Sequence, residues 1–148
     1  IGEFAFGECT SLKEITIPDS VTKIGDSAFW FCESLTNIII PDSVTEISYS
    51  AFGGCEKLAD ENGFVIVKNV LYNYYGNAEK VIIPDYVTKI GAYAFENCEY
   101  IEEITIPDSV TKIGDKVFSG CEDLVIKAPE NSYAHEYAKE KKIKFEAV

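Results

Sequence analysis

Residues Ile104 to Cys121, with the sequence ITIPDSVTKIGDKVFSGC, decide the fold because nearly the same residues recur three more times. The other copies read ITIPDSVTKIGDSAFWFC at 15–32, IIIPDSVTEISYSAFGGC at 38–55 and VIIPDYVTKIGAYAFENC at 81–98. A truncated fifth copy opens the chain, from Ile1 to Cys9. Repetition at a period of a few tens of residues is typical of a solenoid, in which each repeat forms one coil.

The spacing of equivalent prolines measures the period of these repeats. Pro18 and Pro41 are 23 residues apart, and so are Pro84 and Pro107. Pro41 and Pro84 are 43 residues apart, which is one period plus 20 residues. The third repeat therefore carries an insertion. We expect a single domain over 1–148, with about five repeats, an insertion over 59–78 and a C-terminal cap over 129–148. Because Ile1 falls inside a repeat, we expect this domain to be a fragment of a longer array.

Each repeat is predicted to form one coil with two short strands and one helical turn. Apolar residues over 12–17 point inward as in a half-buried strand, and Pro18 then turns the chain. A second short strand covers 21–24, and Gly25 follows at a bend that needs either a positive φ or a close backbone approach. Apolar residues spaced i, i+1 and i+4 over 28–32 predict one face of a single helical turn.

The interior of the stacked coils is predicted from two columns of equivalent residues. A lone coil cannot bury its apolar face, whereas stacked coils can. The first column is a core of phenylalanines: Phe6, Phe29, Phe52, Phe95 and Phe118. All five cysteines share the position three residues later. Side chains in such a ladder point the same way, whereas a disulfide needs them to converge. We therefore expect buried thiols, with a disulfide pair or a metal site as the alternatives.

The insertion and the tail are predicted to add regular structure of their own. Residues 64–67 and 70–75 form a β-hairpin around Lys68-Asn69. A helix opens near Pro129, with Ser132 or Asn131 as its N-cap. Its apolar stripe is formed by Tyr133, Ala134, Tyr137 and Ala138. A short strand over 143–145 then closes the chain, and this segment caps the last coil.

Composition and charge exclude several classes of function. Of 148 residues 47% are hydrophobic, which is enough to bury one domain-sized core. The net charge of −12 comes from 25 acidic residues against 13 bases, all of them lysine. This charge repels phosphate backbones, and without arginine there is no bidentate fork for phosphate or guanine. We therefore expect no nucleic-acid partner. Without an apolar run of about 18 residues, we also expect no membrane insertion.

The repeat, written I-x-I-P-D-S-V-T-x-I-G-x-x-A-F-x-x-C-x-x-L, resembles the BspA-like leucine-rich repeats of bacterial surface proteins. The V-L-Y hairpin of the long repeat and the closing segment from Ser132 to Phe145 are similar too. The resemblance implies an α/β leucine-rich-repeat solenoid. This solenoid is right-handed, with mainly short parallel strands, one helical turn per coil, a β-hairpin insertion and a C-terminal helix–strand cap. The resemblance also implies a secreted or cell-surface bacterial protein with a role in adhesion or protein binding, and no catalytic residues.

Candidate ligand-binding residues are those where one repeat departs from its siblings toward aromatic character. Trp30 and Phe31 stand where the other coils carry Gly-Glu, Gly-Gly, Glu-Asn and Ser-Gly. Tyr49 replaces aspartate or alanine and Tyr93 aligns with serines, so both are candidates together with Trp30 and Phe31. Tyr86 also replaces a serine but is left outside the candidate set. Large exposed aromatic side chains are enriched at binding hot spots. The alternatives are that these rings pack within the molecule or cover a segment outside this sequence.

A second candidate surface is the outward face of the main sheet. Its column nearest the proline runs Thr16, Ile39, Ile82 and Thr105. Two exposed isoleucines flanked by charge could seat a partner, so we include Ile39 and Ile82 among the candidate ligand-binding residues. A plain solvated β face is the alternative.

The function predicted from these residues is a non-enzymatic, cell-surface or secreted binding module. The alternative is a structural spacer without a ligand of its own. His135, the only histidine, is interpreted as a solvated helix residue, and we expect no catalytic site, cofactor or metal. We expect the partner to be a protein or a glycan on a host or neighbouring cell. We expect a monomer. The exposed N-terminal coil is the surface that we expect to pack on a neighbouring molecule.

Overall fold

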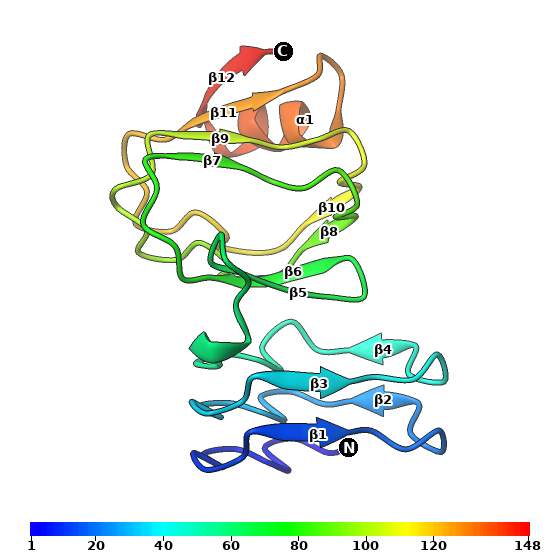
Figure 1. The fold of residues 1–148 in the computed structure, drawn as a ribbon. Helices are drawn as coiled ribbons and strands as arrows, with labels where there is room; N and C mark the ends of the chain where they lie inside the picture. The colour runs from blue at the N-terminus through cyan, green and yellow to red at the C-terminus, as the bar shows by residue number, and fades with distance from the viewer. The chain divides into compact units, whose positions relative to one another are not determined.

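The computed structural model describes all residues, 1–148, and these form two compact units, Ile1–Val65 and Ile66–Val148. The boundary falls inside strand β5 (Phe64–Val67). Both units consist of coils whose short strands pair in parallel with those of neighbouring coils (Figure 1). The solenoid predicted from the repeats is therefore confirmed, whereas a single domain across both units stays a prediction.

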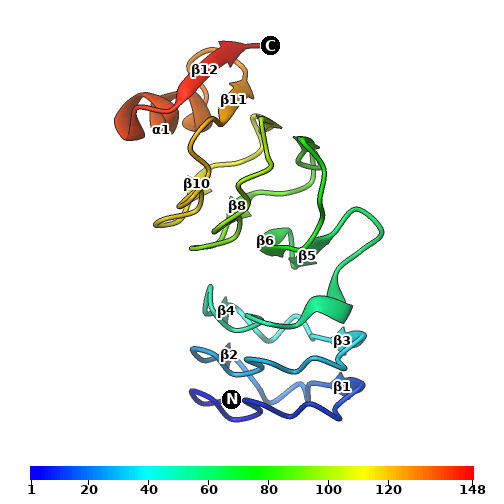
Figure 2. The ribbon, with the colours of Figure 1, turned by 90° about the vertical axis from the view of Figure 1, so that its left-hand side faces the viewer.

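The N-terminal unit contains two narrow parallel sheets. Its elements are β1 (Glu14–Thr16), β2 (Lys23–Ile24), β3 (Asn37–Ile39), β4 (Glu46–Ile47) and the short 3-10 helix η1 (Glu56–Leu58). β1 pairs with β3 and β2 with β4, each offset by one repeat, so that Ile15 lies opposite Ile38 and Ile24 opposite Ile47. Figure 2 shows the two sheets on opposite sides of these coils.

The C-terminal unit continues the same pattern with wider sheets. Its elements are β6 (Val70–Tyr74), β7 (Lys80–Ile82), β8 (Lys89–Ile90), β9 (Glu103–Thr105), β10 (Lys112–Ile113), β11 (Val125–Ala128), α1 (Tyr133–Lys141) and β12 (Lys144–Ala147). One sheet has the strand order β12-β11-β9-β7, and the other has the order β10-β8-β6-β5. No helix of the structure has the length and apolar character that crossing a membrane requires.

The predicted phenylalanine column forms the core of both units. Phe29 is fully buried and stacks on Phe6 with ring centroids 5.2 Å apart and on Phe52 at 5.7 Å. Phe95 stacks on Phe118 at 5.5 Å. Offset or tilted aromatic pairs at such separations add to the stability that burial itself provides. The interior prediction is confirmed, because identical residues one period apart lie in contact.

The insertion forms the predicted hairpin and takes a place in the solenoid. Lys68 and Asn69 link β5 to β6 with φ values of 48° and 62°, as two-residue hairpin turns require. β6 pairs in parallel with β8, with Leu71 opposite Ile90, so it occupies the position of a second strand. Tyr74 lies 5.1 Å from Phe95 in the aromatic column. The insertion is therefore a divergent coil in which tyrosine replaces phenylalanine.

The segment predicted as one helical turn forms two consecutive tight turns. The N–H of Trp30 donates to the carbonyl of Ser27 at 3.0 Å, and the N–H of Cys32 donates to that of Phe29 at 3.1 Å. Ser27 and Phe31 have φ values of 50° and 53°, which interrupt a right-handed helix. At Gly25 the close-approach alternative is correct, because an added Cβ would lie 2.9 Å from the backbone nitrogen of Glu3.

The five cysteines are free thiols, and those of Cys32, Cys55 and Cys121 donate hydrogen bonds to backbone carbonyls one coil earlier. The Cys32 Sγ donates to the Phe6 carbonyl at 3.1 Å. These side chains thus form the predicted thiol ladder, with a directional bond at each of these three steps. The prediction of burial is correct for Cys32, Cys55 and Cys98 and wrong for Cys9 and Cys121, which are partly exposed. No cluster of three or more histidine, cysteine or acidic residues is arranged to hold a metal ion.

The C-terminal segment covers the last coil. Ser132 is the N-cap of α1, since its side chain accepts a hydrogen bond from the N–H of His135 at 3.2 Å. The buried stripe of α1 consists of Ala134, Tyr137 and Ala138. Tyr133, predicted in this stripe, is exposed, because the first turn of α1 directs it away from the core. The Tyr137 ring meets Phe118 edge to face at 6.2 Å and so ends the aromatic column.

Candidate functional site

Three aromatic side chains of the N-terminal unit lie together at its surface. The rings of Trp30 and Phe31 are 4.4 Å apart at an interplanar angle of 61°, and Phe4 meets Trp30 edge to face at 6.1 Å. Phe4 is 51% exposed and Phe31 is 41% exposed, while Trp30 is partly buried. We call Phe4, Trp30 and Phe31 the aromatic cluster.

The backbone conformation at Phe31 and Phe4 is one that phenylalanine rarely adopts. Phe31 has a φ of 53°, and the equivalent positions in other coils are Gly54 at 76°, Asn97 at 60° and Gly120 at 87°. Glycine and asparagine enter this left-handed region easily, whereas other residues pay about 1–2 kcal/mol. Phe4 also has a positive φ, of 51°. Because Glu8 and Asn97 share this positive φ with Phe31, and Ser27, Tyr93 and Lys116 share it with Phe4, the turn geometry belongs to the repeat, and only the choice of an aromatic residue distinguishes these two positions.

Two glycines of the next coil form the floor under the cluster. A Cβ placed on Gly53 would lie 3.1 Å from Trp30 Cδ1, and one placed on Gly54 would lie 2.7 Å from Phe31 Cδ2. The rings therefore rest on bare backbone. The alternative of internal packing is correct for one side of these rings, and their other side faces solvent.

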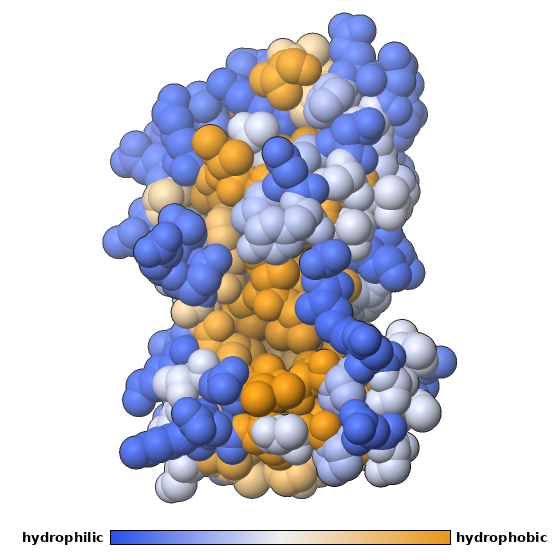
Figure 3. All heavy atoms as spheres, turned by 45° about the vertical axis from the view of Figure 1, so that its right-hand side comes forward, coloured by the Kyte–Doolittle hydropathy of each residue, from blue (hydrophilic) through white to orange (hydrophobic).

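The other four predicted residues differ in exposure and are divided between the two units. Ile39 is 55% exposed on the outer face of β3, and Tyr49 is partly buried. Ile82, 72% exposed on β7, and Tyr93, 45% exposed, belong to the C-terminal unit. In Figure 3, apolar side chains also reach the surface of the N-terminal unit in a patch bordered by hydrophilic residues. Among the six predicted residues, Trp30 and Phe31 are in ring contact with each other, and ligand binding by all six stays a prediction.

Phe4 is the residue that sequence reasoning missed. It occupies the repeat position of Ser27, Ser50 and Tyr93. Comparing coils at this position identified Tyr93, and the same comparison in the truncated first coil would have found Phe4. Its contact with Trp30 links two different repeat positions, and only the structure shows that.

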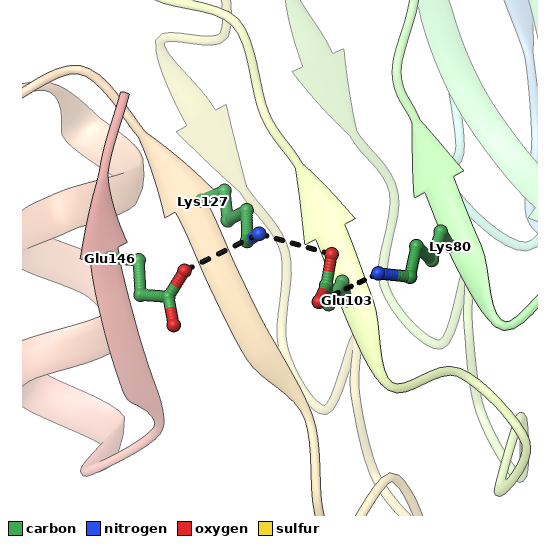
Figure 4. A network of polar contacts seen from close by, with 4 residues as sticks. All are labelled: Lys80, Glu103, Lys127 and Glu146. Atoms are coloured by element: carbon green, nitrogen blue, oxygen red, sulfur yellow. Dashed lines mark hydrogen bonds and ion pairs between the residues drawn. The ribbon is translucent and has the colours of Figure 1, made fainter.

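The outer face of the main sheet in the C-terminal unit is lined by paired charges (Figure 4). Glu103 on β9 accepts from Lys80 of β7 at 3.1 Å and from Lys127 of β11 at 3.0 Å. Lys127 also reaches Glu146 of β12 at 3.3 Å. The hydrogen bond from Lys127 lowers the pKa of Glu103, and the bond to Glu103 raises the pKa of Lys127. Ion pairs therefore join the strands across this face, and Ile82 of β7 is exposed on the same side of its strand as Lys80.

Parallel coils, a stacked aromatic column and a capping helix define a leucine-rich-repeat solenoid, an architecture consistent with a protein-binding module. The sequence model described as the BspA type leucine rich repeat region matches residues 1–62 and 65–141 as six copies. The chain belongs to this family. The six copies are one more than the roughly five repeats expected from the sequence. The additional copy is explained by the insertion, because β5 and β6 form a divergent coil.

Solved structures of bacterial proteins resemble this chain. A leucine rich cell surface protein from Faecalibacterium prausnitzii is 28% identical with a TM-score of 0.50, and the match covers 85% of this chain and 44% of that one. The leucine rich repeat protein of T. pallidum is 29% identical with a TM-score of 0.45, over 86% and 50% of the two chains. The chain thus spans half or less of the length of these relatives. No curated protein matches the sequence.

Proposed function

We propose that this protein is a non-enzymatic, cell-surface or secreted binding module that recognises a partner protein through the aromatic cluster. The observation that carries the proposal is the ring pair of exposed Phe31 and partly buried Trp30, held on a turn where other coils carry small or polar residues. Aromatic residues supply large contact area and dominate binding hot spots. The similar protein from F. prausnitzii is described as a cell surface protein, which supports a location at the cell surface for this one.

A structural spacer without a ligand is the second candidate. The charge network of Lys80, Glu103, Lys127 and Glu146 favours it, because a charge-paired face suits a module that only projects another domain. A spacer does not require exposed aromatic rings, whereas a binding module does. The aromatic cluster therefore favours the binding module over the spacer.

The test exchanges single aromatic residues for those of sibling coils. The purified protein is applied to an array of purified extracellular proteins and glycans, together with Phe31→Asn and the matched control Tyr86→Ser. Both variants replace an exposed ring with the residue found in another repeat. Loss of a hot-spot residue weakens capture about tenfold or more, whereas the control stays within about twofold. A spacer predicts no saturable capture, or capture that Phe31→Asn leaves unchanged.

A further inference from the structure

We propose that the aromatic cluster binds an arginine- or lysine-rich segment of its partner protein. This inference rests on the proposed function and specifies the chemistry of the partner. Three features of the N-terminal unit carry it: carboxylates beside the rings, the absence of internal cations for them, and ring faces open to solvent.

Exposed glutamates neighbour the cluster in the sequence and in the adjoining coil. Glu3 precedes Phe4, and Glu33 follows Phe31 by two residues. Glu8 occupies the repeat position of Phe31 one coil earlier, and its backbone N–H donates to the carbonyl of Trp30 at 2.6 Å. Equivalent residues of stacked coils are about 4.8 Å apart, so the Glu8 side chain starts beside Phe31.

These carboxylates have no cation of their own. The N-terminal unit carries eleven acidic residues and three lysines, a net charge of −8. Its ion pair joins Lys23 to Glu46 at 2.9 Å, and Glu3, Glu8 and Glu33 take part in none. A partner with negative charge would be repelled here, whereas a cationic segment would find unpaired carboxylates.

The C-terminal unit shows how the same repeat position behaves when a cation is present. Tyr93, the equivalent of Phe4, has the ammonium of Lys116 at 5.8 Å from its ring centroid. Lys116 stands at the same position one coil later, where Phe4 has Ser27 instead. The cation that Tyr93 receives from its own chain is therefore missing beside Phe4, and a partner can supply it.

Guanidinium and ammonium groups suit this combination of rings and acids. Tryptophan is the strongest of the aromatic side chains in binding a cation over its face. An arginine can lie flat on a ring and bond a carboxylate with its planar fork at the same time. Phe4 is 51% exposed and Phe31 is 41% exposed, so these two rings are accessible to such a cation from solvent.

Intrinsic fluorescence provides a direct test, because Trp30 is the only tryptophan of the chain. The probe is a short synthetic peptide in which arginine alternates with glycine, and the reference peptide has serine in place of arginine. We expect a saturable change of Trp30 emission with the arginine peptide only. The paired variant Glu8→Gln with Glu33→Gln should weaken binding about two- to tenfold, and Phe31→Asn should weaken it by a similar factor.

The control removes the same amount of charge at the other end of the coils. Asp19 and Asp42 are exposed in the turns that follow β1 and β3, and Asp19→Asn with Asp42→Asn should keep the Kd within about twofold. Equal weakening by both double variants would show attraction to net charge alone and would overturn the proposal. An arginine peptide without effect on emission would overturn it too. If Phe31→Asn nevertheless abolished capture of a purified protein, the proposed function would stand with a partner of different chemistry.

Discussion

The thiol of Cys55 donates a 3.0 Å hydrogen bond to the carbonyl oxygen of Phe29, which belongs to the preceding coil. Cys121 makes the same bond to Phe95 at 3.3 Å. The cysteine column therefore connects coils through side chains in addition to the strand ladders, and a small apolar residue at this position would keep the packing and lose the bond.

Cys55 should resist alkylation in the folded protein. Burial raises the pKa of its thiol to about 12, so almost none of it is thiolate near neutral pH, and the thiolate is the reactive form. Cys9, which is partly exposed, should be modified first. Mass spectrometry of iodoacetamide-treated peptides, with and without denaturant, measures both. Rapid labelling of Cys55 in the native protein would contradict the ladder.

Phe29 and Phe31 should separate stability from binding. Phe29→Ala removes a fully buried ring between two stacked neighbours and should lower the free energy of unfolding by about 3–5 kcal/mol. Phe31→Asn relieves a left-handed phenylalanine and should change that free energy by less than about 1 kcal/mol. Urea unfolding followed by circular dichroism measures both variants. A large loss of stability in Phe31→Asn would show that this ring is structural.

Glu103→Gln should change how stability depends on pH. The pKa of Glu103 is lowered in the folded state from its ordinary value of 4.5, chiefly by its hydrogen bond with Lys127. The stabilisation is therefore present above 4.5 and disappears as the pH falls through the lowered value. The Tm difference between the original protein and Glu103→Gln should be largest near neutral pH and vanish in acid. A difference that is constant across this range would exclude the ion pairs as its source.

Gly54→Ala should disturb the aromatic cluster from beneath. Gly54 has a φ of 76°, and the added Cβ would lie 2.7 Å from the Phe31 ring. We expect a loss of about 1–2 kcal/mol in the free energy of unfolding and a shifted Trp30 emission, because the neighbouring ring must move. Gly2→Ala serves as the control, since its Cβ would meet nothing within 4 Å. Unchanged emission in Gly54→Ala would show that the rings do not rest on this glycine.

Much of the fold could be predicted because the repeat determines its own register. Identical residues one period apart placed Ile15 opposite Ile38 and Phe29 against Phe52, as the structure confirms. The turn before the cysteine could not be assigned correctly. Apolar residues spaced i, i+1 and i+4 fit a helical turn and two tight turns equally well, and the backbone at Ser27 decides between them.

The candidate site could be predicted in part. Trp30 and Phe31 stood out because sibling coils carry small or polar residues there. Their contact with Phe4 depends on side-chain directions between different repeat positions, which a linear comparison of repeats does not contain. The pairing of Tyr93 with Lys116 is different, because it joins the same repeat position in neighbouring coils, so a comparison of repeats could have found it.

The left-handed turn position has a consequence for how such proteins acquire new ligands. Its backbone keeps a positive φ whichever side chain it carries: Glu8, Phe31, Gly54, Asn97 or Gly120. A coil can therefore change this side chain without changing its own turn, but a side chain added at Gly54 or Gly120 would meet the residue at this position one coil earlier. Within each unit, an engineer could therefore build a new recognition surface at this position by choosing the side chains of neighbouring coils together.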